Sequence, residues 1–68
     1  MSIFEQLGCT EDLDYEGVYH HDKLPFELVE KEGFISLYVN LEYEVSRKKI
    51  PYTKKALENL IAAFNPKQ

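Results

Sequence analysis

The sequence predicts a small α+β domain with a short N-terminal helix, a two- or three-stranded antiparallel β-meander, and a C-terminal amphipathic helix packed on one sheet face. Three stretches support this prediction. Residues 34–45, FISLYVNLEYEV, alternate apolar and polar side chains, as does a strand with one buried face. Residues 53–64 carry apolar side chains at helical spacing. Residues 2–8 begin with a helix-capping pattern.

The predicted N-terminal helix is short. Ser2 is a suitable N-cap, Glu5 follows three residues later as in a capping box, and Gly8 is a natural terminator. Because an isolated helix of this length is not stable in water, we expect it to dock on the sheet.

An exposed loop is predicted to follow, in residues 9–16, which contain four acids. Residues 17–21 are a weaker candidate for a first strand, and the sequence leaves open whether a strand forms around Val18–His20. A second short strand is predicted at residues 26–30, and a KEG turn folds it back onto the long alternating stretch.

The length of this turn decides the register of the hairpin. A two-residue loop pairs Leu28 with Leu37 and Phe26 with Val39, whereas a three-residue loop with Gly33 in the left-handed region sets Val29 beside Ile35. We favour the two-residue loop because it gathers four apolar side chains.

The alternating stretch is the longest predicted strand. Its apolar series consists of Ile35, Leu37, Val39, Leu41, Tyr43 and Val45. It is about twice the usual strand length, so either the strand is strongly twisted or Asn40 marks a bulge or bend. Since neither Gly nor Pro interrupts it, we expect one element. A separate expectation is that either this long strand or the short strand before it is an open edge of the sheet.

The C-terminal helix is predicted to begin after Thr53 as N-cap and to end at Asn65-Pro66. Its apolar side chains fall within about 140° of one another on a helical wheel. They are Ala56, Leu57, Leu60, Ile61 and Phe64. We expect this stripe to cover the Ile35–Val45 face of the sheet.

Composition limits the class of protein. The 68 residues are expected to form a single small domain, 1–68, whose 44% hydrophobic and 29% charged residues are typical of a globular protein. No apolar run approaches the length of a membrane span, and the N-terminus lacks a signal-peptide pattern. One cysteine precludes an internal disulfide, so we expect a cytoplasmic location.

Charge is divided along the chain. Residues 1–46 carry a net charge of −9, whereas residues 47–68 carry +5. One interpretation is that the two blocks screen each other in exposed pairs, each worth roughly 0–1 kcal/mol. The other is that they form two separate binding surfaces.

The favoured function is non-catalytic binding of another protein through an acidic and aromatic surface, as in a regulator, inhibitor, antitoxin or accessory subunit. Exposed aromatic side chains beside a polar rim are typical of protein contacts. A homodimer is compatible with the same features. The predicted partner-binding residues are Phe34, Tyr38, Glu42, Glu44, Glu11, Asp12, Asp14 and Glu16.

The alternative function is nucleic-acid binding through the basic segment, residues 47–55. Its cations are Arg47, Lys48, Lys49, Lys54 and Lys55. The pI near 5.0 and the lack of a nucleic-acid-binding motif count against it.

Catalytic and metal chemistry have one weak candidate cluster, formed by Cys9, His20, His21 and Asp22. Adjacent histidines on a strand point to opposite faces, and a lone cysteine does not complete a zinc motif. No Walker, GxSxG or HExxH motif is present. We therefore expect no enzyme, metal or cofactor.

Overall fold

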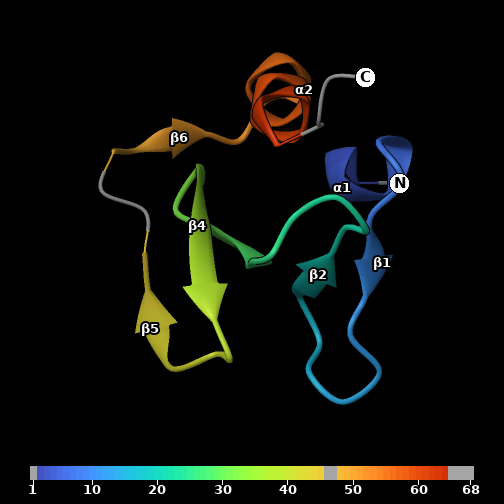
Figure 1. The fold of residues 1–68 in the computed structure, drawn as a ribbon, viewed down its shortest axis with the longest axis vertical. Helices are drawn as coiled ribbons and strands as arrows, with labels where there is room; N and C mark the ends of the chain where they lie inside the picture. The colour runs from blue at the N-terminus through green and yellow to red at the C-terminus, as the bar shows by residue number, and fades with distance from the viewer. Residues whose placement is uncertain (1, 46–47, 65–68) are drawn as a thin grey trace.

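Six strands and two helices make up residues 2–45 and 48–64, the part of the chain that the computed structural model describes (Figure 1). The elements are α1 (Ile3–Gln6), β1 (Thr10–Glu11), β2 (Val18–His20), β3 (Glu27–Lys31), β4 (Phe34–Val39), β5 (Tyr43–Glu44), β6 (Ile50–Pro51) and α2 (Lys54–Ala63). Neither helix in this part of the chain has the length and apolar character of a membrane span.

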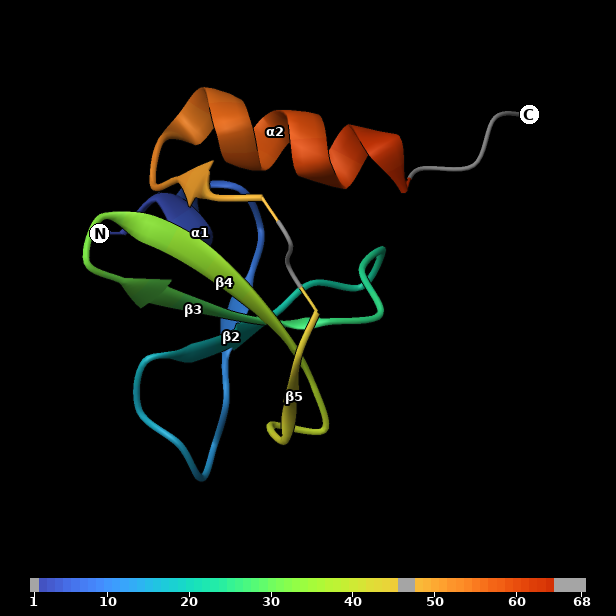
Figure 2. The same cartoon turned by 90° about the vertical axis from the view of Figure 1, so that its left-hand side faces the viewer.

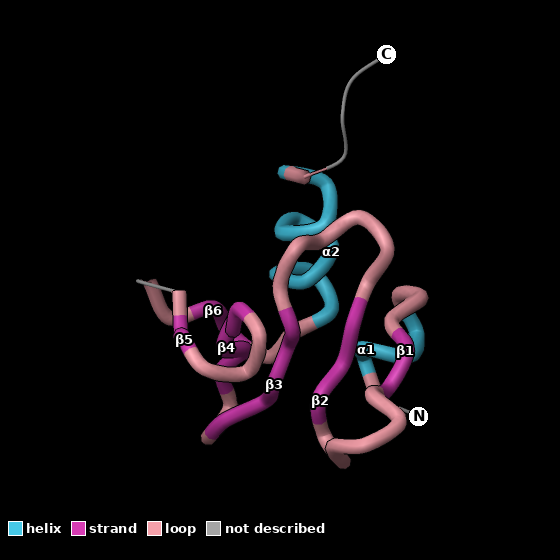
Figure 3. The backbone as a smooth tube through the Cα atoms, turned by 60° about the horizontal axis from the view of Figure 1, so that its bottom comes forward, coloured by secondary structure: helices cyan, strands magenta, loops and turns pink. Residues whose placement is uncertain are grey.

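The strands form one antiparallel sheet in the order β1-β2-β3-β4-β5, and β6 pairs with β4 (Figure 3). The α+β class, the antiparallel sheet and the two terminal helices are confirmed. The predicted two or three strands are too few. The weaker candidate strand around Val18–His20 is present as β2. β3 and β4 are each flanked on both sides, so neither is an open edge; of the predicted long strand, only its last part, β5, stands at the end of the strand order.

The predicted long strand is divided by a tight turn. Asn40 and Leu41 have φ of 55° and 59°, and the Glu42 N–H donates to the Val39 carbonyl at 3.1 Å. Two successive left-handed residues suit the twist of a hairpin. The Leu41 N–H also donates to Glu27 Oε1 at 3.1 Å, which helps to hold this turn against β3.

The β3–β4 hairpin has the two-residue register. Lys31 is paired with Phe34 across the turn, and Leu28 is paired with Leu37, as predicted. Glu32 and Gly33 have φ of 53° and 84°, so the glycine occupies a conformation that it adopts at little cost. β3 begins at Glu27, so Phe26 lies before the ladder and its predicted pairing with Val39 is not part of it.

β5 and β6 pair successively with the same side of β4. The Val45 N–H donates to the Leu37 carbonyl at 2.8 Å, whereas Ile35 is paired with Ile50. The step from Leu37 to Ile35 on β4 covers two positions, whereas the step from Val45 to Ile50 on the facing chain covers five. Lys48 and Lys49 consequently lie outside the ladder, where the pairing of β4 passes from β5 to β6.

The core lies between the sheet and the helices (Figure 2). Leu28 and Leu57 are 0% exposed, and Phe4 and Ile35 are also fully buried. Ser2 forms the predicted capping box with Glu5. Thr53 is the N-cap of α2, whereas the predicted helix end at 65–66 lies outside the described residues.

Helix α2 covers less of the predicted apolar face than expected. Ile35 and Leu37 are buried in the core, but Tyr43 and Val45 are exposed because they follow the turn into β5. Phe64 at the end of α2 packs edge-on against Phe26, with ring centroids 5.3 Å apart.

Replacing Leu57 by Ala should lower the free energy of unfolding by about 2–5 kcal/mol, because it removes a fully buried side chain and leaves a cavity. The matched control, Leu13→Ala, alters a side chain that is 99% exposed and should change the free energy by less than about 0.5 kcal/mol. Urea unfolding followed by circular dichroism measures both. Equal losses would contradict the burial described here.

Candidate functional site

The acidic loop between β1 and β2 is held by its own carboxylates. Asp12 Oδ1 accepts the N–H groups of Asp14 and Tyr15 at 2.8 and 3.1 Å. Asp12 Oδ2 lies 2.7 Å from His20 Nε2. Glu11 Oε2 accepts the Gly17 N–H at 2.8 Å. Two of the predicted partner-binding residues, Glu11 and Asp12, thus order the loop itself.

The electrostatics of this loop favour an ionised Asp12. The hydrogen bond with His20 lowers the pKa of Asp12 most, and the backbone N–H groups of Asp14 and Tyr15 act in the same direction. The negative charge is therefore retained to lower pH than in an unfolded chain.

The end of the loop presents apolar side chains. Leu13 is 99% exposed and Tyr15 is 57% exposed, next to the exposed acids Asp14 and Glu16. The β4–β5 turn lies at the same end of the molecule, away from α2, and leads into Tyr43, which is 68% exposed (Figures 1 and 2).

We call this end the tip surface and define it by Leu13, Asp14, Tyr15, Glu16, Glu42 and Tyr43. Three of its members, Leu13, Tyr15 and Tyr43, are not among the predicted partner-binding residues. The alternation of a continuous strand places Tyr43 in the core. Leu13 and Tyr15 are the apolar and aromatic side chains within a run of acids, which is the signal that could have identified them.

Phe34, Tyr38 and Glu44 lie on the face of the sheet that Leu28 does not occupy. Tyr38 is paired with Glu44 on β5, and Phe34 is partly buried on the same face of β4. A lysine covers each ring. Lys31 Nζ donates to the Tyr38 hydroxyl at 2.9 Å, and Lys49 Nζ lies 4.9 Å from the centroid of the Phe34 ring.

The eight predicted residues therefore form two groups rather than one surface. Four of them lie in β1 and the loop after it, whereas the other four lie on β4, the β4–β5 turn and β5, on the other side of β3 in the sheet order.

A pocket of about 370 Å³ opens on this second group. Its lining consists of Lys31, Glu32, Phe34, Ile35, Ser36, Glu44, Lys48 and Lys49. Lys54 and Lys55 of the predicted basic segment lie instead in the first turn of α2, and Arg47 lies outside the described residues.

The described lysines of the basic segment are not paired with acids. Within residues 2–45 and 48–64, none of Lys48, Lys49, Lys54 and Lys55 forms an ion pair with a carboxylate. One interpretation of the divided charge was that the acidic and basic blocks screen each other through exposed ion pairs. These four lysines do not form such pairs with the described carboxylates.

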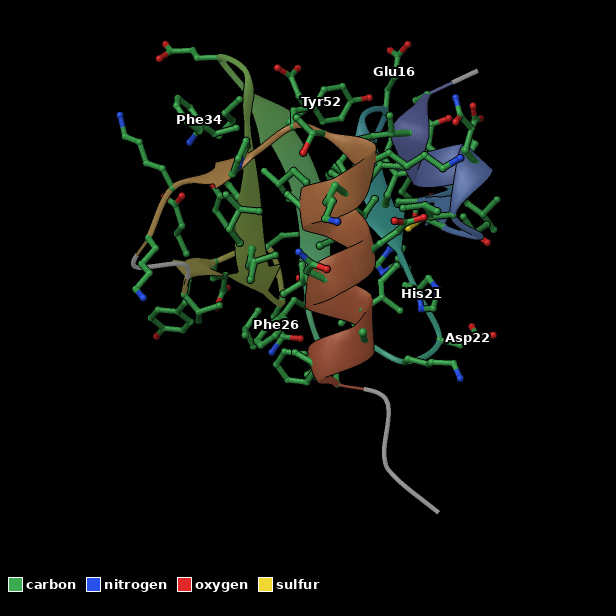
Figure 4. The ribbon with its side chains drawn as sticks, turned by 90° about the horizontal axis from the view of Figure 1, so that it is seen from above. Glu16, His21, Asp22, Phe26, Phe34 and Tyr52 are labelled. Atoms are coloured by element: carbon green, nitrogen blue, oxygen red, sulfur yellow. The ribbon has the colours of Figure 1, made fainter. Side chains whose placement is uncertain are left out.

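The residues considered for metal or nucleophilic chemistry differ in their surroundings. Cys9 is buried, which raises the pKa of its thiol and disfavours the thiolate. His20 contacts Asp12, whereas His21 Nδ1 accepts the Lys23 N–H at 3.0 Å. His21 and Asp22 lie on the far side of α2 from Phe34 (Figure 4). In the described part of the chain, no three His, Cys, Asp or Glu side chains converge on a metal position.

The carboxyl group of Asp12 should titrate below the ordinary value of 3.8, as followed by carbon-13 NMR. Because its pKa is lowered on folding, Asp12 contributes stability above the unfolded pKa and loses it as pH falls through the folded pKa. His20→Ala should move the midpoint toward 3.8, while His21→Ala should leave it in place. A wild-type midpoint at or above 3.8 would contradict the hydrogen bonds to Asp12.

Comparison with known proteins gives no match of significance for this chain, whether with protein families, curated sequences or solved structures.

Proposed function

We propose that this protein is a non-catalytic binder of another protein and that the tip surface makes the contact. The observation that supports this proposal is the complete exposure of Leu13 on a loop that hydrogen bonds hold in place. Clustered exposed apolar side chains rimmed by polar residues are typical of protein interaction sites.

The energetics favour such a contact. Transfer of a leucine side chain from water to a buried environment gains roughly 1.5–3 kcal/mol, and tyrosines add area at low entropic cost. Because Asp12 and Glu11 already order the loop, binding need not fix it again. Leu13 and Tyr15 would thus serve as the anchors of the interface.

The charges beside these anchors indicate a basic partner. Asp14 and Glu16 are exposed and alternate in sequence with Leu13 and Tyr15, and Glu42 is exposed next to Tyr43. Opposite charge on a partner would accelerate association and make it sensitive to salt. A cytoplasmic regulator, inhibitor, antitoxin or accessory subunit belongs to this class, and the single cysteine is consistent with a reducing compartment.

The test compares three baits in nuclease-treated lysate of the source cells: the wild type, the Leu13→Ser/Tyr15→Ala variant, and the Lys54→Gln/Lys55→Gln control. A captured protein is then purified and its Kd measured by calorimetry at two salt concentrations. The tip variant should bind at least about tenfold more weakly, as expected for loss of buried anchors. The control should bind like the wild type.

Two results would reject this proposal. The first is a purified partner whose Kd is unchanged by the tip variant. The second is a partner lost equally with both variants, because the tip surface would then have no special role.

A second candidate function is nucleic-acid binding, favoured by the unpaired state of Lys48, Lys49, Lys54 and Lys55 among the described residues. The last two lie in the first turn of α2, where the helix dipole disfavours cations. An external anion would relieve that cost.

Nucleic-acid binding predicts a Kd that rises steeply with salt, because bound counterions are released from the phosphates. Replacing Lys48, Lys49, Lys54 and Lys55 by Glu should then abolish binding to a fluorescent oligonucleotide, measured by anisotropy. Retention of affinity in this variant, or a Kd insensitive to salt, would exclude the basic segment as the contact.

A further inference from the structure

The pocket on β4 lies where the pairing of this strand passes from β5 to β6. Ile35 is paired with β6, and the next position toward the same edge, Leu37, bonds to Val45 after β5. Ser36 lies between them and lines the pocket, as do Lys48 and Lys49, which have left the ladder. The fold thus brings Lys48 and Lys49 to the pocket beside β4.

Three lysines from two distant parts of the sequence meet in this pocket. Lys31 precedes the β3–β4 turn, whereas Lys48 and Lys49 precede β6. None of them is ion-paired with Glu32 or Glu44, which line the same pocket. Lys49 lies over the Phe34 ring and Lys31 bonds to Tyr38. The three ammonium groups share the pocket with only two carboxylates, so one net positive charge is left that a bound anion would neutralise.

The lining also limits the kind of anion. Glu32 and Glu44 leave the pocket only one net positive charge, and the chain as a whole carries −4. A long polyanion would approach these carboxylates and the acidic remainder of the protein. A compact anion that stays within the pocket meets only the lining charges, because exposed charges beyond about 8 Å are largely screened at physiological salt. The volume of about 370 Å³ lies at the lower end of the range for small-molecule sites.

We propose that the β4 pocket binds a small phosphate monoester whose organic part carries hydroxyl or amino groups. Lys31, Lys48 and Lys49 hold the phosphate, since lysine is a common point-charge ligand for phosphate. Glu32 and Glu44 accept hydrogen bonds from the organic part, and the Phe34 ring supplies an apolar wall. The tip surface takes no part in this site, so this proposal is independent of the proposed function.

Calorimetry and amide NMR titration on the full chain test it with four probes: ribose 5-phosphate, adenosine monophosphate, inorganic phosphate and unphosphorylated ribose. The two esters should bind more tightly than inorganic phosphate, and ribose should not bind. Lys48→Gln/Lys49→Gln should weaken ester binding at least about tenfold, as for the loss of hydrogen bonds to a charged group. Lys54→Gln/Lys55→Gln, with the same change in net charge, should leave it within about twofold.

Glu44→Gln should have opposite effects on the two parts of the site, the lysines that hold the phosphate and the carboxylates that hold the organic part. It should strengthen the binding of inorganic phosphate, because it removes a nearby negative charge, and weaken the advantage of the esters over phosphate. The lysines and Glu44 are exposed, so these variants should fold, as circular dichroism checks.

Several outcomes would overturn the proposal. They are no binding of either ester at millimolar concentration, equal binding of inorganic phosphate and of the esters, and equal loss in the two double-lysine variants. An affinity for oligonucleotides that grows with their length would assign the lysines to nucleic acid instead.

Discussion

The pairing of Leu28 with Leu37 is the contact on which the rest of the molecule depends. Leu28 is fully buried at the centre of the sheet, and Leu57 of α2 packs in the same cluster. The two-residue turn fixes this register, and a slip of one residue would turn every side chain of β4 to the other face. The same register places Phe34, Ser36 and Tyr38 together on the opposite face, where the pocket forms.

Sequence reasoning predicted the elements that have local signals. Both N-caps and the β3–β4 register follow from a few neighbouring residues. The β4–β5 turn was missed for a physical reason. Its three-residue loop pairs Val39 with Tyr43, so odd-numbered positions stay on one face and the alternation continues as if the strand had not turned. The two-residue strands β1, β5 and β6 are too short to carry a periodic pattern.

The candidate sites were harder to predict because they depend on pairing rather than on composition. The basic segment is recognisable from its charge, but its separation into pocket lysines and helix lysines depends on where β4 changes from pairing with β5 to pairing with β6. Lys31 lines the pocket because the hairpin register pairs it with Phe34. At the tip surface, the acids were found from their density, whereas the exposure of Tyr43 follows only once the turn at Asn40 is known.

The order of the strands has a consequence for how quickly the chain folds. Each strand from β1 to β5 pairs with its neighbour in sequence, so the sheet grows by successive hairpins with little loss of loop entropy. The most distant contact is different, since α1 and α2 pack together from opposite ends of the chain. Closure of the core therefore requires residues from both ends of the chain, because Leu57 of α2 joins Phe4 of α1 and Leu28 of β3 in one cluster.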